Sequence, residues 1–233
     1  MQLEENLKEI ESKLFPQKSF NVFDVLKISS YEIRHSNVLT WLFDGKASHQ
    51  LKYSFLQTFI STIKQNSANN QGRLLIDDSV EVYREFYNID IVVCSSKQKW
   101  VIAIENKINH HETEFQLQNY GSVISEYFKD YDQHYFLLSK NGIISSYPEL
   151  WKSIGYEEIL NILDEITSKF SEKTNSQILE FIDQYKTIIR RDIVKDDKST
   201  RELIEFYYRN KSILDKIYEV IPTESKQYKG ANY

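Results

Sequence analysis

Two acidic side chains and a lysine near the middle of the chain are spaced so that they could act together. Residues 88–107, NIDIVVCSSKQKWVIAIENK, contain two apolar, β-branched runs separated by a short polar segment. This pattern predicts a β-hairpin whose centre lies between Lys97 and Gln98. In an antiparallel hairpin without a bulge, two residues that are equally far from the centre of the turn face each other. We therefore expect Asp90 opposite Glu105, with both carboxylates on one face of the sheet.

Carboxylates that face each other on a sheet repel, and a divalent cation between them would remove the repulsion. Lys107 lies two residues beyond Glu105, so the alternation of side chains along a strand places its ammonium group on the same face. An Asp, a Glu and a Lys around one point suit the hydrolysis of a phosphodiester. We expect Asp90 and Glu105 to bind Mg²⁺, with Mn²⁺ as a substitute, while Lys107 orients or helps to deprotonate the attacking water.

Several motifs support a resemblance to a known family. Asp90 is followed, after fourteen intervening residues, by Glu105, Asn106 and Lys107 at the end of an apolar strand. This arrangement resembles the PD-(D/E)XK nuclease superfamily, and further pieces of the chain resemble its RecB-like branch over roughly residues 30–165. These pieces are YEIRHSNVLTWLFD at 31–44, NIDI at 88–91, IENKI at 104–108, QLQNY at 116–120, FLLSKNG at 136–142 and WKSIGYEEI at 151–159. The resemblance implies a restriction-endonuclease-like fold and a product that carries a 5′-phosphate.

Glu32 is a candidate for a third metal ligand. It lies at the start of a helix expected at residues 31–43, and nucleases of the resembling superfamily often carry a glutamate on the helix before the core sheet. The alternative is a solvated glutamate near a helix N-terminus, where negative charge is favoured in any case. The sequence leaves both readings open.

Gln116 and Tyr120 are four residues apart on a helix expected at residues 112–128, so they share one face. Both could point at the substrate phosphate or brace Lys107. This pair resembles the glutamine and tyrosine that RecB-type nucleases carry after the active strand, which favours a catalytic role for Gln116 and a substrate-binding role for Tyr120. The alternative is that Tyr120 packs in the core and Gln116 is solvated.

The other chemically interesting residues have structural interpretations that we prefer. His35 and His49 are expected to make structural hydrogen bonds. Cys94 lies in an apolar strand as the single cysteine, which excludes an intrachain disulfide and indicates a buried thiol. The mixed-charge segment 186–201 is typical of a solvated surface, although its six basic residues could contact a nucleic-acid backbone. We treat Glu85 as structural.

Composition limits the classes of protein that fit. The chain has 233 residues, of which 41% are hydrophobic and 27% charged, as in an ordinary globular protein. A formal charge of −5 argues against a broad basic surface that grips nucleic acid, so tight capture of substrate points to a further domain, a homodimer or a regulatory protein partner. The first residues, MQLEENLKEIESKL, lack the apolar region of a signal peptide, and no stretch reaches the ~20 apolar residues of a membrane span. We expect a cytoplasmic protein that does not enter a membrane.

The elements predict an α/β fold: a mixed central sheet of four or five strands with helices on both sides, and a C-terminal helical extension. We expect residues 1–170 to form a nuclease-like domain that includes N-terminal helices, and residues 171–233 to form the extension packed on it. Expected helices span residues 3–14, 21–28, 31–43, 50–65, 112–128, 156–169, 175–192 and 199–221; expected strands lie within 74–87, 89–93, 100–104 and 135–138.

Together, the residues and the resemblance lead us to expect Mg²⁺-dependent hydrolysis of DNA phosphodiesters, in a setting compatible with restriction or anti-phage defence. Two alternatives remain open. One is a catalytically silent module of the same fold that binds nucleic acid or acts as a scaffold, against which the intact Asp90, Glu105 and Lys107 argue. The other is an interaction module whose acidic cluster is incidental.

Overall fold

The computed structural model describes residues 19–65, 74–109, 112–170, 174–194 and 198–224. The chain divides into two compact units, residues 21–195 and residues 1–20 together with 196–233. In the second unit the described element is helix α8 (Lys198–Glu224). The helix expected at residues 3–14 lies outside the described residues, and the expected boundary at residue 170 stays a prediction.

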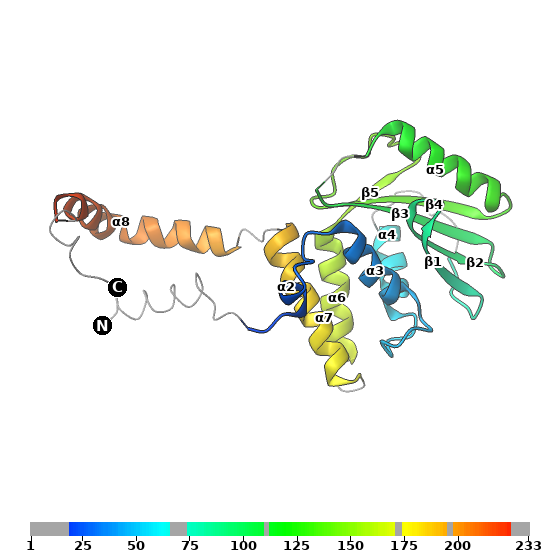
Figure 1. The fold of residues 1–233 in the computed structure, drawn as a ribbon, viewed down its shortest axis with the longest axis horizontal. Coiled ribbons are helices and arrows are strands. Elements are labelled where there is room, and N and C mark those ends of the chain that lie inside the picture. Colours follow the sequence, from blue (N-terminus) through cyan, green and yellow to red (C-terminus); the bar gives the residue numbers. More distant parts are fainter. Residues whose placement is uncertain (1–18, 66–73, 110–111, 171–173, 195–197, 225–233) are drawn as a thin grey trace. The chain divides into compact units, whose positions relative to one another are not determined.

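The unit formed by residues 21–195 is built on a five-stranded mixed sheet (Figure 1). Strands β1, β2 and β3 are antiparallel neighbours, whereas β4 and β5 continue the sheet in parallel. The strand order β1-β2-β3-β4-β5 confirms the predicted mixed sheet. The strands span Val80–Phe86 (β1), Ile89–Ser95 (β2), Trp100–Lys107 (β3), Asp132–Ser139 (β4) and Lys152–Gly155 (β5).

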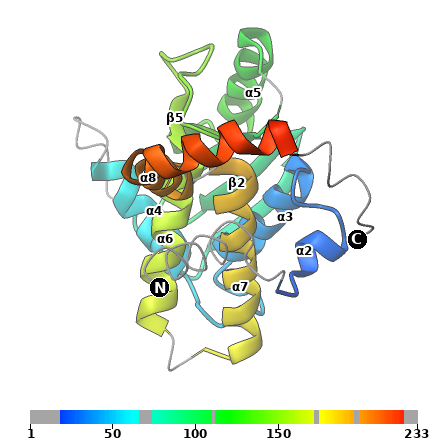
Figure 2. The same cartoon turned by 90° about the vertical axis from the view of Figure 1, so that its left-hand side faces the viewer.

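Helices cover both faces of the sheet, as the apolar character of β2 and β3 on both faces predicts. Helix α5 lies on one side of the sheet, and α3 and α4 lie on the other (Figure 1). Figure 2 shows α6 and α7 side by side, in agreement with their contacts. The helices span Val22–Val25 (α2), Glu32–Phe43 (α3), Ser54–Gln65 (α4), Glu114–Tyr127 (α5), Tyr156–Phe170 (α6) and Ser176–Ile188 (α7), and a π-helix (η1) follows at Ile189–Val194.

Each face of the sheet has its own core. On the side of α3, α4 and α6, Phe43 packs edge-on against Phe55 and Phe59 with ring centroids 4.9 and 5.0 Å apart. On the other side, Leu117 and Ile124 of α5 are fully buried against β2 and β3. Burying one such side chain stabilises a fold by about 1.5–3 kcal/mol, so both cores hold β2 and β3 firmly in place.

Among the described residues, no helix combines the length and the apolar character that a membrane crossing needs.

Candidate active site

The register of β2 against β3 is the one that the sequence predicts. Ser95 pairs with Trp100, and the pairing continues without a break to Ile91 and Ile104. One further step along both strands places Asp90 opposite Glu105. The two carboxylates therefore sit at the same end of adjacent central strands.

Glu105 is 2% exposed, and its two carboxylate oxygens have different surroundings. Oε1 accepts hydrogen bonds from Nζ of Lys107 at 2.9 Å and from Nε2 of Gln116 at 3.1 Å. Oε2 is buried and has no hydrogen-bond partner among the described residues. Burial, and then the negative charge of Asp90, raise the pKa of Glu105 to about 7.

Asp90 is held by its neighbours on both sides. Its Oδ2 atom accepts a hydrogen bond from the backbone N–H of Asn106 at 2.9 Å, and Oδ1 lies 3.5 Å from Nη1 of Arg84. The same Arg84 nitrogen donates to the carbonyl oxygen of Asp90 at 2.8 Å. Burial raises the pKa of Asp90, although the Asn106 hydrogen bond and the Arg84 charge act in the opposite direction. Both carboxylates are thus harder to ionise than usual.

Lys107 lies on the same face as Glu105 and is largely buried, with 16% of its side chain exposed. Burial by itself lowers the pKa of a lysine, but the hydrogen bond to Glu105 and the charges of Glu105, Asp90 and Glu32 outweigh it and raise the pKa of Lys107. Lys107 therefore carries a positive charge at neutral pH. A charged ammonium can orient water and stabilise negative charge, but it does not accept a proton.

Glu32 comes close to this group from the first turn of α3. Its Oε1 atom accepts hydrogen bonds from the backbone N–H groups of Ile108 at 2.8 Å and Asn109 at 2.7 Å. Its charge also contributes to the raised pKa of Asp90. Glu32 therefore braces the chain directly after Lys107, and its expected role as a metal ligand stays a prediction.

Gln116 and Tyr120 share one face of α5, as expected. Nε2 of Gln116 donates both to Glu105 and, at 2.9 Å, to the hydroxyl of Tyr120. Tyr120 also packs against the core on the α5 side of the sheet. We call Asp90, Glu105, Lys107 and Gln116 the carboxylate cluster. Tyr120 supports Gln116 from one helical turn away.

Two residues that the sequence analysis did not select contribute to the site. Asn106 has a fully buried side chain that points to the opposite face, where Nδ2 donates to Oγ of Ser36 at 3.0 Å and Oδ1 accepts from the hydroxyl of Tyr156 at 2.9 Å. The signal for Asn106 was a polar residue inside an apolar strand. Arg84 gave no such signal, because its contact with Asp90 crosses the β1–β2 turn, and Tyr87 and Asn88 lack the glycine that usually marks a two-residue turn.

The remaining candidates have structural roles. His35 is hydrogen-bonded to the carbonyl of Ser29 and to the hydroxyl of Tyr185, and His49 to the carbonyl of Asp44. Cys94 is buried, and burial raises its pKa to about 11. Among the described side chains of segment 186–201, the basic ones are paired with acidic ones: Lys186 and Arg190 with Asp164, and Arg191 with Asp24.

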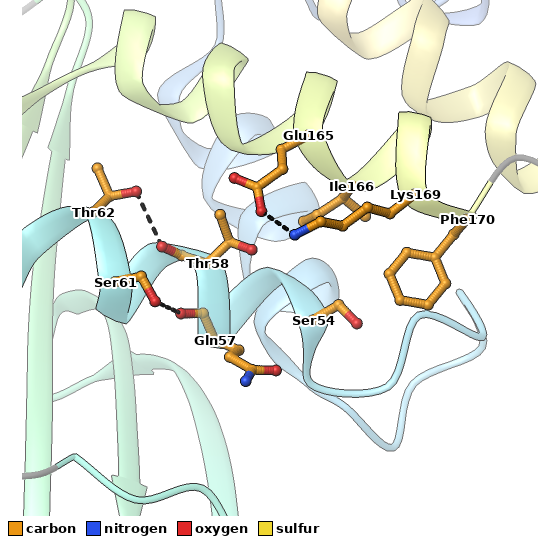
Figure 3. A pocket seen from close by; sticks show the side chains of 9 residues that line it. All are labelled: Ser54, Gln57, Thr58, Ser61, Thr62, Glu165, Ile166, Lys169 and Phe170. Atoms are coloured by element: carbon orange, nitrogen blue, oxygen red, sulfur yellow. Dashed lines mark hydrogen bonds and ion pairs between the residues drawn. The ribbon is translucent and has the colours of Figure 1, made fainter.

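A pocket of about 380 Å³ lies between α4 and α6 and has a polar lining (Figure 3). Several of its side chains are already engaged within their own helix. Ser61 donates to the carbonyl of Gln57, Thr62 donates to the carbonyl of Thr58, and Lys169 pairs with Glu165. None of the carboxylate-cluster residues lines this pocket.

The residues of the cluster fit a divalent cation. Asp90 and Glu105 offer hard carboxylate oxygens, and the partnerless Oε2 of Glu105 is a buried acceptor for which a cation is a suitable partner. In the part of the chain that the structure describes, no group of three or more His, Cys, Asp or Glu side chains is arranged to hold a metal. Asp90 and Glu105 would therefore be the two carboxylate ligands of such a cation, and further ligands would come from water, backbone, substrate or, if its predicted role holds, Glu32.

Comparison with known proteins identifies a family. The family model described as the PD-(D/E)XK nuclease superfamily matches residues 20–187. No curated protein and no solved structure matches the chain.

Proposed function

Because the chain belongs to the PD-(D/E)XK nuclease superfamily, we propose that it hydrolyses phosphodiester bonds of DNA with the help of Mg²⁺. The observation that carries this proposal is the buried Oε2 atom of Glu105, which has no hydrogen-bond partner among the described residues. Asp90 lies on the adjacent strand, and the Lys107 ammonium binds the other oxygen of Glu105. Such an arrangement is costly in a protein without a cation, because the buried carboxylate of Glu105 and the partly buried carboxylate of Asp90 repel each other. A bound divalent cation would remove this repulsion, and its removal would contribute to the affinity for the cation.

Asp90 and Glu105 would hold Mg²⁺, or Mn²⁺ in its place. The cation would supply charge neutralisation at the phosphate and a water of lowered pKa. Lys107 would orient the attacking water and stabilise the negative charge that develops on the phosphate oxygens, a role for which its raised pKa suits it. Gln116 would fix the Glu105 carboxylate in position. By analogy with the family, the product would carry a 5′-phosphate.

The partners and the biological role of the protein are proposed from its net charge. The formal charge of −5 is unfavourable for unaided capture of a polyanion, so we propose that a second copy of the chain or a regulatory protein assists substrate binding. Restriction or defence against phage is compatible with such a regulated nuclease. A module of the same fold that binds without cutting would not need the three intact residues Asp90, Glu105 and Lys107.

The test is cleavage of linear, circular and single-stranded DNA, with RNA alongside, in Mg²⁺ or Mn²⁺ and in EDTA. The Glu105→Gln variant is the matched control, because it keeps the shape of the side chain and removes its charge. We expect cutting that needs metal and is lost in the variant. A wild-type protein that neither cuts any of these substrates nor binds metal would refute the proposal.

A further inference from the structure

Four aromatic side chains form a continuous patch where the β1–β2 turn meets the end of α5. We call them the aromatic patch: Tyr83, Phe86, Tyr87 and Tyr127. The ring of Tyr127 lies 4.7 Å from that of Tyr87 and 5.5 Å from that of Phe86, while Tyr83 lies 5.6 Å from Phe86. Tyr87 and Tyr127 are 52% and 50% exposed, and their hydroxyl groups are hydrogen-bonded to each other.

The position of Tyr87 is unusual for its residue type. It forms the β1–β2 turn together with Asn88, and both residues have positive φ angles, of 48° and 69°. Asn and Gly are favoured in such a two-residue turn, whereas a positive φ is uncommon for a bulky aromatic residue. The sequence thus places a tyrosine where it costs backbone energy, and leaves half of the side chain in solvent. Outliers of this kind cluster at binding sites.

The patch and the carboxylate cluster lie at the two ends of one face of α5. Gln116, Tyr120, Val123 and Tyr127 follow one another at helical spacing along one face of α5, from the residue that contacts Glu105 to the residue that contacts the turn. At 1.5 Å per residue this face is about 16 Å long. Tyr120 and Val123, which lie between these ends, are partly buried and pack on the core on the α5 side of the sheet. On the other strand of the turn, Asp90 follows Tyr87 by three residues.

The two basic side chains that contact the carboxylates are engaged by them. The Arg84 guanidinium is engaged with the carboxylate and the carbonyl of Asp90, and the Lys107 ammonium with Glu105. Affinity for a duplex comes largely from lysine and arginine contacts with phosphates. Stacking of bases on exposed aromatic rings needs no such charge, but it needs bases whose faces are free.

We propose that the aromatic patch stacks unpaired bases, so that the substrate is a single-stranded nucleic acid whose backbone passes the carboxylate cluster. This inference rests on the proposed nuclease function and adds its substrate class. A face about 16 Å long matches roughly five stacked nucleotides at ~3.4 Å each. A duplex, whose bases are covered by their neighbours, gains nothing from these rings.

Binding in EDTA tests the inference without any cleavage. The probes are a fluorescently labelled oligothymidylate about a dozen nucleotides long and a duplex of the same length, followed by anisotropy. The variant Tyr87→Ala/Tyr127→Ala removes the two exposed rings, and the matched control Tyr87→Phe/Tyr127→Phe keeps both rings and removes the hydroxyl groups. We expect the wild type to bind the single strand more tightly than the duplex. We expect the alanine variant to lose about tenfold or more in affinity for the single strand, and the phenylalanine variant to stay within about twofold of the wild type.

The opposite results would overturn the inference. These are equal binding of the two probes by the wild type, unchanged single-strand affinity in the alanine variant, or an equal loss in the phenylalanine variant. Sedimentation of the wild type and the alanine variant provides a second check. A wild-type dimer that the alanine variant converts to a monomer would make the patch an interface between copies and would also overturn the inference. If the protein cuts DNA but these variants behave alike, only the substrate class fails; if it neither cuts any substrate nor binds metal, the proposed function itself fails.

Discussion

The hydroxyl of Tyr156 donates a hydrogen bond of 2.9 Å to Oδ1 of Asn106, on the face of the sheet opposite to the carboxylates. The backbone N–H of the same Asn106 donates to Oδ2 of Asp90. One residue thus connects the helix layer of α3 and α6 to a carboxylate of the candidate site, through its side chain on one face and its backbone at the strand end.

We expect Tyr156→Phe to destabilise the protein by about 1–3 kcal/mol, because it leaves the buried Oδ1 of Asn106 with one donor fewer in a place that water does not reach. Urea denaturation measures this change. Tyr208→Phe, which removes the hydroxyl of an exposed tyrosine, serves as the control and should leave the free energy of unfolding unchanged. Equal free energies of unfolding in the two variants would mean that the hydrogen bond from Tyr156 to Asn106 does not contribute to stability.

The stability of the metal-free protein should fall as the pH rises from about 4.5 to about 7. The pKa of Glu105 is raised to about 7 in the folded state, so between these values the folded protein binds more protons than the unfolded chain. The stabilisation is therefore complete below the unfolded pKa and is lost as the pH passes the folded one. We expect a change on the order of 3 kcal/mol in EDTA. Denaturation at a series of pH values should show it in the wild type, and Glu105→Gln should flatten the slope.

Addition of Mg²⁺ should stabilise the wild type against heat. A ligand that binds only the folded state at ten times its dissociation constant adds about 1.4 kcal/mol. Asp90→Asn should abolish this gain. Asp78→Asn is the matched control, because Asp78 is an exposed carboxylate paired with Lys97 and does not contact the cluster. An equal thermal shift in both variants would place the cation elsewhere.

Glu32→Gln distinguishes a brace from a metal ligand. The substitution removes the negative charge of residue 32, but the carbonyl oxygen of glutamine can still accept the hydrogen bonds from the N–H groups of Ile108 and Asn109. If Glu32 acts as a brace, we expect cleavage within about a factor of three of the wild type, whereas Glu32→Ala should lose much more. Loss of cleavage and of Mg²⁺ affinity in the glutamine variant would instead support the role as a third ligand.

The parts of the site that lie close together in the sequence were predictable. The register that faces Asp90 with Glu105 follows from a hairpin with a short loop, where counting from the centre is sufficient, and the helical spacing of Gln116 and Tyr120 is equally local. The predicted mixed sheet of four or five strands is confirmed, with five strands, and so is the membership of the superfamily that the motifs imply.

Other features gave no clear signal in the sequence. Arg84 lies six residues before Asp90, across the two-residue β1–β2 turn, but Tyr87 and Asn88 lack the glycine that usually marks such a turn. Glu85 adopts a positive φ of 57° that no propensity indicates. Strand β5, with four residues, is too short to show an alternation of apolar and polar side chains. The brace formed by Glu32 joins residues 76 and 77 positions apart, a separation at which sequence patterns carry no geometric information.

The hairpin of β2 and β3 also has a consequence for folding kinetics. Its contacts are local, and hairpins form within microseconds. The parallel pairing of β3 with β4 forms more slowly, because the segment between them, which contains α5, must first fold back so that the two strands meet. Asp90 and Glu105 are thus brought together while solvent still surrounds them, and their repulsion opposes the earliest step. Because dissolved ions screen exposed charges, we expect the refolding rate of the metal-free chain to increase with ionic strength.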